Sequence, residues 1–211
     1  MMIRHSSKIG LLSSAAVAVI VLLFLVYLIL GLFGISMNSA SFFVQLWLAL
    51  FYVVMVICIG DRTPPEKEVF LKVSLTLSLI YAVLCSLSCY VQLAVVRTNP
   101  LALSPDVLVA LGFVPGSVFF SAGMLGYTFL ALSTLFLIPF AWNTALKVLL
   151  AIHGAMALPA FVFPLLGIQS SAGGVDYLSY GFIFWCMLFL PIVILFMIGF
   201  IKQLKAEKQM Q

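Results

Sequence analysis

Charged side chains are scarce in this sequence. They make up 8% of its 211 residues, whereas hydrophobic residues make up 65% and the mean hydropathy is +1.29. A typical soluble domain is about 25% charged. A folded globule of this length has too little interior to hide so much apolar surface. The composition therefore excludes a soluble enzyme, a nucleic-acid-binding protein and a disordered chain. It leaves a polytopic membrane protein whose partner is the lipid bilayer.

Cysteine is also sparse, and the four cysteines all lie within apolar runs, at Cys58, Cys85, Cys89 and Cys186. None lies in a polar loop, so we expect no disulfide framework. Cys85 and Cys89 are one helical turn apart, but a metal site needs more ligands than the sequence offers nearby. We therefore expect no metal site and no cofactor.

The positions of the charges divide the chain. Uncharged runs cover residues 9–60, 73–96, 107–146, 148–175 and 177–201. A membrane-spanning helix needs roughly 20 apolar residues, and in lipid its backbone polar groups must be satisfied within the segment. The first run has room for two spans, separated by the polar, turn-prone stretch 34–39.

The run from 107 to 146 is ambiguous in length, but Pro115 and Gly116 interrupt it near its start. We interpret 107–115 as a short interfacial or re-entrant segment that precedes the fourth span. The predicted fold is all-α: a polytopic transmembrane bundle of six helices that forms a single integral-membrane domain over residues 1–211. Its spans are expected at about 9–33, 41–60, 72–96, 117–141, 146–168 and 178–201.

The distribution of Lys and Arg predicts the orientation. Short loops rich in these residues stay in the cytoplasm, and six spans place every Lys and Arg except Arg97 on the side of both termini. If residues 107–115 crossed the membrane, Lys147 and the lysines of the tail would change sides and the asymmetry would disappear. We therefore expect both termini in the cytoplasm. The net charge of +4 is then a topogenic signal and requires no nucleic-acid partner.

The third span holds the clearest polar stripe. Spacings of three and four residues place its members on one helical face: Ser74, Ser78, Tyr81, Cys85, Ser88 and Gln92. Two interpretations remain open: the lining of a hydrated cavity or solute path, and hydrogen bonding between packed helices. Within this stripe, Tyr81, Cys85, Ser88 and Gln92 are candidate ligand-binding residues. Gln92 stands out because its amide is both a donor and an acceptor.

Two further candidate ligand-binding residues lie outside that stripe. His153 is the one titratable side chain well inside a span that is not Cys or Tyr, and Arg97 is the one basic residue on the far side. A membrane-embedded His indicates either a proton relay or ligand contact, or a neutral ring bonded to a neighbouring helix. No Asp, Glu, Lys or Arg lies deep in any predicted span, so we assign no catalytic residue.

Small residues and prolines indicate local packing. Ala122 and Gly126, like Ser14 and Ala18, have the small-xxx-small spacing of closely packed membrane helices. Pro159, together with Pro164, is expected to bend the fifth span in its outer half.

The stretch 126–136 reads Gly-Tyr-Thr-Phe-Leu-Ala-Leu-Ser-Thr-Leu-Phe and is followed by a proline and a short turn. It resembles small multi-span bacterial inner-membrane proteins of uncharacterised function. The resemblance implies that the protein is located in a bacterial inner membrane. It implies no activity and identifies no site residue.

Three functional hypotheses remain open. The first is a non-enzymatic protein that binds a small or apolar solute as a transporter component, since its six-span size resembles the vitamin-capturing subunits of energy-coupled transporters. The second is a structural or regulatory subunit of a membrane complex. The third is a membrane enzyme acting on a lipid-like substrate, but the spans lack a cluster of acid, base and nucleophile. We therefore favour a non-enzymatic role.

Overall fold

The computed structural model describes residues 2–35, 38–61, 63–166 and 177–209, and in these ranges the chain is all-α, as predicted. Its α-helices are α1 (Met2–Leu32), α2 (Asn38–Gly60), α3 (Glu68–Val91), α4 (Pro105–Leu111), α5 (Val118–Leu135), α6 (Thr144–Ala155), α7 (Ala157–Leu165) and α8 (Tyr177–Gln209). A π-helical turn, η2 (Gln92–Val96), continues α3, and short 3-10 turns lie at η1 (Pro65–Lys67) and η3 (Ile138–Phe140).

Six helices are long and apolar enough to cross a membrane, with α6 and α7 together forming one of them. With its seven residues, α4 is too short to cross. The predicted six-helix bundle with a short segment before the fourth span is therefore confirmed, and the architecture is that of a multi-pass integral membrane protein.

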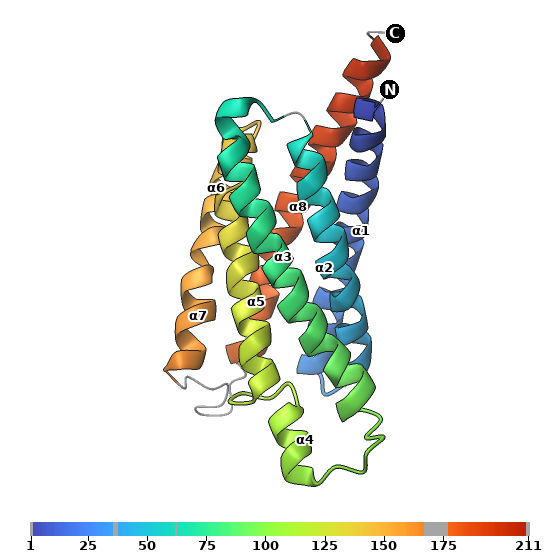
Figure 1. Ribbon diagram of the computed structural model, residues 1–211, viewed down its shortest axis with the longest axis vertical. Coiled ribbons are helices and arrows are strands. Elements are labelled where there is room, and N and C mark those ends of the chain that lie inside the picture. Colours follow the sequence, from blue (N-terminus) through green and yellow to red (C-terminus); the bar gives the residue numbers. More distant parts are fainter. Residues whose placement is uncertain (1, 36–37, 62, 167–176, 210–211) are drawn as a thin grey trace.

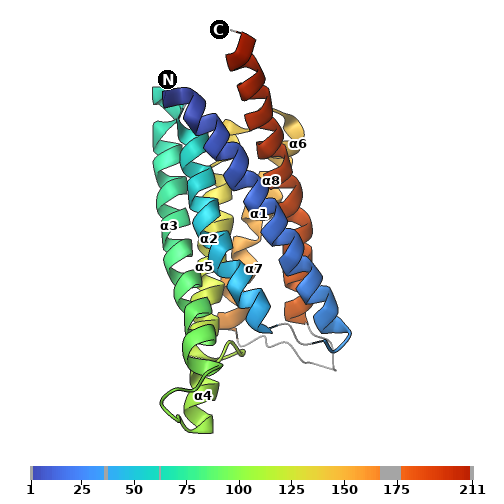
Figure 2. The same cartoon turned by 90° about the vertical axis from the view of Figure 1, so that its right-hand side faces the viewer.

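The spans form a closed ring. Each packs on the next along the chain: α1 on α2, α2 on α3, α3 on α5, and α5 on α6 and α7. Contacts from α6 to α8 and from α8 back to α1 complete the circuit. Both termini lie at one end of the bundle, here called the terminal end, while α4 lies at the opposite end (Figures 1 and 2).

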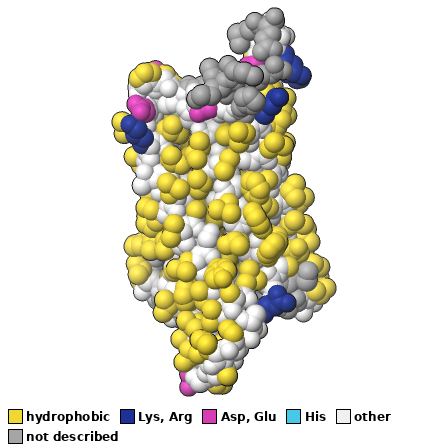
Figure 3. Space-filling model, turned by 45° about the vertical axis from the view of Figure 1, so that its right-hand side comes forward, with side chains coloured by type: hydrophobic (Ala, Val, Ile, Leu, Met, Phe, Trp, Pro, Cys, Tyr) yellow, Lys and Arg dark blue, Asp and Glu magenta, His cyan; other side chains and the backbone are white. Residues whose placement is uncertain are grey.

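The outer surface is an apolar band between charged ends. On the face drawn in Figure 3, charged side chains appear only near the two ends, and hydrophobic side chains cover the middle. Large hydrophobic side chains are exposed along the spans, among them Val19, Val83 and Met187 at 58–66%. Such a band would be unfavourable in water but matches the hydrocarbon core of a bilayer.

Several helices are longer than the predicted spans. α1 begins at Met2 and α3 at Glu68, and α8 continues to Gln209. The apolar runs identify the part of a helix that suits lipid, whereas the helix itself continues into polar residues that are good helix formers.

Prolines end two helices earlier than the predicted spans. α5 ends at Leu135 instead of near residue 141, because Pro139 lacks the N–H that would bond the carbonyl of Leu135. The fifth span is likewise interrupted between α6 and α7, where Pro159 cannot bond the carbonyl of Ala155.

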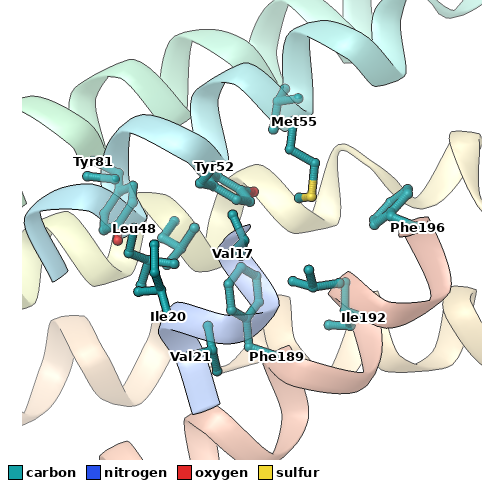
Figure 4. Close-up of a cluster of buried hydrophobic side chains, with 14 of the residues drawn as sticks. Val17, Ile20, Val21, Leu48, Tyr52, Met55, Tyr81, Phe189, Ile192 and Phe196 are labelled. Carbon is teal, nitrogen blue, oxygen red and sulfur yellow. The ribbon is translucent and has the colours of Figure 1, made fainter. Parts of the chain in front are cut away.

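The interior of the bundle is filled by large side chains from several helices. Figure 4 shows side chains of α1, α2, α3 and α8 converging on the centre. They include Val17, Leu48, Tyr52, Tyr81 and Phe189, each with no exposed surface. Because lipid tails are as apolar as these side chains, close packing and hydrogen bonds between helices hold such a bundle together.

Candidate functional site: an aromatic cluster inside the bundle

The polar stripe on α3 faces inward, because all six of its residues are at most 5% exposed. Two of its serines bond the neighbouring helix α5: Ser74 Oγ donates to the carbonyl of Ser133 at 3.0 Å, and Ser88 Oγ donates to the carbonyl of Phe119 at 3.1 Å. Interhelical hydrogen bonds of this kind are what we expect if the stripe serves to pack α3 against its neighbour.

Gly126 explains how α3 and α5 approach so closely. A Cβ atom at this position would lie 3.4 Å from Leu84 Cβ and 3.5 Å from the backbone nitrogen of Cys85. The small residue therefore lets the two backbones come near each other, as the small-xxx-small spacing of Ala122 and Gly126 predicts.

The side chain of Gln92 hydrogen-bonds to the segment between α4 and α5 and holds that segment next to the end of α3. Its Nε2 donates to the carbonyl of Leu111 at 2.8 Å, and its Oε1 accepts from the backbone N–H of Phe113 at 2.9 Å. Both ends of the amide are thus bonded to backbone groups.

The candidate residues do not all meet at one place. Arg97 lies exposed at the opposite end of the bundle, just after η2. Ser88 and Gln92 bond elements at that same end. On α3, Cys85 lies about one turn deeper than Ser88, and Tyr81 lies about two turns deeper. Tyr81 and His153 both belong to a single group of aromatic rings in the interior.

Six aromatic side chains from five helices form this group, called here the aromatic cluster. It comprises Tyr52 of α2, Tyr81 of α3, Tyr127 of α5, His153 of α6, and Trp185 and Phe189 of α8. The rings follow one another in a closed cycle, with successive centroids 4.9–6.1 Å apart, in the order Tyr52, Tyr81, Tyr127, Trp185, His153, Phe189 and back to Tyr52. All six are at most 5% exposed. Figure 4 shows Tyr52, Tyr81 and Phe189 within the core.

Two of the three tyrosine hydroxyls in the aromatic cluster have strong partners. Tyr52 Oη bonds Ser133 Oγ at 2.5 Å, and Tyr127 Oη donates to Gln45 Oε1 at 2.5 Å. These bonds link α5 to α2.

Three other polar atoms of the cluster lack a partner. Among the described residues, Tyr81 Oη, His153 Nε2 and Trp185 Nε1 are buried without a hydrogen bond. The polar group beside the Tyr81 hydroxyl is the Cys85 thiol, a weak partner. Buried polar groups are nearly always bonded, so three unpartnered atoms in one contiguous cluster are unusual.

The hydrogen bonds around His153 indicate which ring nitrogen carries the proton. Thr134 Oγ1 donates its single hydrogen to the carbonyl of Ala131 at 2.7 Å, so it must accept from His153 Nδ1 at 2.9 Å. In the neutral ring, Nε2 is then a bare acceptor.

The aromatic cluster therefore offers three different hydrogen-bonding groups. His153 Nε2 accepts, Trp185 Nε1 donates, and Tyr81 Oη does either. None of the six side chains is an Asp, Glu, Lys or Arg. Within the described part of the chain, no three His, Cys, Asp or Glu side chains gather closely enough to hold a metal ion.

Sequence reasoning identified Tyr81 and His153 but missed Tyr52, Tyr127, Trp185 and Phe189. One signal was available for three of them: Tyr and Trp concentrate at membrane interfaces, yet Tyr52, Tyr127 and Trp185 lie well inside their spans. An interior Tyr or Trp needs a polar partner inside the bundle.

No family model matches this chain, and no curated protein or solved structure matches it either.

Proposed function

We propose that this chain is a non-enzymatic, multi-pass protein of the bacterial inner membrane that binds a small or apolar solute at the aromatic cluster, as a component of a transporter. The observation that carries this proposal is the gathering of three unpartnered polar atoms, Tyr81 Oη, His153 Nε2 and Trp185 Nε1, in one buried group of rings. The bacterial membrane is supported by the resemblance of residues 126–136.

The three unpartnered atoms lower the free energy of unfolding of the solute-free protein. A buried donor or acceptor left without a partner costs about 1–3 kcal/mol. The same interior bonds its other hydroxyls, those of Tyr52, Tyr127 and Ser133, so the fold can satisfy polar groups at this depth. A solute bound among the rings would supply the missing partners and regain that free energy.

The proposed binding mode requires movement of a ring, because the six side chains contact one another directly. The interruption between α6 and α7 lies next to His153. We infer that a shift at this break opens the aromatic cluster to the solute.

We further propose that the termini are cytoplasmic. The asymmetry of Lys and Arg supports this orientation, and the connection between α2 and α3, with the first turn of α3, would then face a cytoplasmic partner. Reporter fusions test it. Green fluorescent protein at the C-terminus should fluoresce, and alkaline phosphatase fused after Arg97 should be active. The reverse pattern would overturn the orientation.

Solute binding is tested with the full-length protein in mild detergent. Its thermal unfolding is measured against a panel of anionic, cationic, neutral and apolar small molecules. We expect at least one solute to raise the unfolding temperature of the wild type. The shift should be reduced in Trp185→Phe and retained in Trp47→Phe, a matched control that changes a side chain 43% exposed on the outer surface.

A panel without any shift, or equal shifts in both variants, would overturn solute binding at the aromatic cluster. Stoichiometric recovery of a membrane partner from such an unresponsive protein would favour a structural or regulatory subunit instead.

A further inference from the structure

We propose that the aromatic cluster selects an uncharged, planar molecule that carries a hydrogen-bond donor beside an acceptor, such as a carboxamide on an aromatic ring. This inference rests on the proposed function and names the chemical class of its solute. Hydrogen bonding, charge and ring geometry support it independently.

The hydrogen-bonding groups define the polar part of the solute. His153 Nε2 needs a donor, because Nδ1 holds the proton that bonds Thr134. Trp185 Nε1 can donate a hydrogen bond but cannot accept one, so it needs an acceptor. The rings of these two residues are neighbours, with centroids 5.9 Å apart. A small molecule with both functions is therefore the simplest partner for these two atoms. Tyr81 is separated from Trp185 by Tyr127, and its hydroxyl would bond a further group of the solute, as donor or acceptor.

The absence of charge in the cluster excludes an ionic solute. The polar side chains that bond or adjoin the six rings in the described structure are all uncharged: Gln45, Ser78, Cys85, Cys89, Ser133, Thr134 and Cys186. An ion transferred from water to such a site would lose its hydration without gaining a counter-charge. Aromatic faces attract cations, but here the free donor of Trp185 opposes one.

The rings favour a flat solute. Phe189 stacks on Trp185 with centroids 5.0 Å apart and planes 26° apart, and on His153 at 4.9 Å and 28°. The planes of His153 and Trp185 are 50° apart, so Phe189 is the ring that stacks on both of its neighbours. Once a ring has moved aside, a planar molecule can take up the same kind of stacking against the faces that remain.

Four probes that share one benzene ring separate these features. Benzamide is neutral with a donor and an acceptor, benzoate is an anion, benzylammonium is a cation, and toluene is apolar. Their binding to the full-length protein in detergent is measured by equilibrium dialysis. We expect benzamide to bind at least tenfold more tightly than each of the other three.

Substitutions test whether the unpartnered atoms cause the tighter binding of benzamide. Tyr81→Phe removes one hydroxyl and Trp185→Phe removes the N–H donor, and each should weaken benzamide binding about fivefold or more. Toluene binding should be unchanged in Tyr81→Phe, which keeps its ring. Tyr90→Phe and Trp47→Phe are the matched controls, since Tyr90 is 61% exposed and Trp47 43%. Should Trp185→Phe fail to fold, Tyr81→Phe still decides the matter, because its hydroxyl has no partner stronger than the Cys85 thiol.

The outcomes separate this inference from the proposed function. Tightest binding of benzoate or benzylammonium would overturn the uncharged class and leave solute binding in place. Toluene binding as tight as benzamide binding would overturn the hydrogen-bonding argument. Failure of all four probes while another solute binds would overturn the planar class. Failure of every solute would overturn the proposed function as well.

Discussion

Replacing Tyr81 with Phe should stabilise the solute-free protein, which is unusual for a change at a fully buried polar side chain. The substitution removes one oxygen atom. That atom has no exposed surface and lacks a hydrogen bond of normal distance and angle among the described residues, and its nearest polar neighbour is the Cys85 thiol, a weak partner. The unfolded chain can bond the hydroxyl to water, whereas the folded chain cannot, so the hydroxyl weakens the fold.

The magnitude follows from two opposing contributions. Removing an unpartnered buried group regains about 1–3 kcal/mol. The lost oxygen gives up a few van der Waals contacts worth about 0.1–0.2 kcal/mol each, which together cost less than about 1 kcal/mol. We therefore expect Tyr81→Phe to be more stable than the wild type by about 0.5–2 kcal/mol.

The other two tyrosines of the aromatic cluster are internal controls. Tyr127→Phe leaves Gln45 Oε1 without its donor and should cost about 1–3 kcal/mol. Tyr52→Phe should cost less, about 0.5–1.5 kcal/mol, because Ser133 Oγ keeps its bond to the carbonyl of Leu130. Three identical chemical changes in one cluster should thus differ in sign and size.

The assay is equilibrium unfolding in mixed micelles of mild detergent and dodecyl sulfate, followed by circular dichroism. A Tyr81→Phe variant destabilised as strongly as Tyr127→Phe would refute the reasoning. That result would mean that the Tyr81 hydroxyl is already bonded in the solute-free protein, and it would remove one of the three observations behind the proposed site.

The remaining predictions concern packing and access. Gln92→Leu should destabilise the protein by about 1–3 kcal/mol, because two partly buried backbone groups lose their hydrogen-bond partner and each costs less than the ~1–3 kcal/mol of a fully buried group. Hydrogen exchange in the α4–α5 connection should rise, and unchanged exchange would contradict the role of this amide. Gly126→Leu should cost about 1–3 kcal/mol by overpacking α3 against α5. Gly181→Leu, where nothing lies within 4 Å, should cost measurably less in the same unfolding assay, and equal costs would argue against the close approach. All four cysteines are buried, so intact mass should show no maleimide adducts on the folded protein and four after denaturation in dodecyl sulfate; rapid labelling of the folded protein would contradict the packing.

The sequence predicted features that depend on one helix at a time. The positions of charges located the spans, and spacings of three and four residues placed Ser74 through Gln92 on the inward face of α3. The end of α5 was placed too late because Pro139 received too little weight in an apolar run, where helix interruption by proline still applies.

Features that join distant helices were not predictable in this way. The partner of Ser74 is a backbone carbonyl on α5, and every residue has such a carbonyl, so no residue pattern marks it. The aromatic cluster draws its members from five helices, and the relation between Tyr52 and Phe189 exists only once the ring of spans has closed. His153 was identified as a candidate, but its bond to Thr134 decides which nitrogen is free, and that bond depends on how α5 and α6 are packed.

The contact between α1 and α8 has a consequence for biosynthesis. The stretch between Leu32 and Tyr177 takes about 7–30 s to translate at roughly 5–20 residues per second. During that interval, Val17 and Phe24 lack the α8 side chains against which their helix packs in the finished protein. The nascent chain must therefore be shielded by lipid, the insertion machinery or a chaperone until its last helix arrives, and ribosome stalling before α8 would expose an incomplete bundle to membrane proteases.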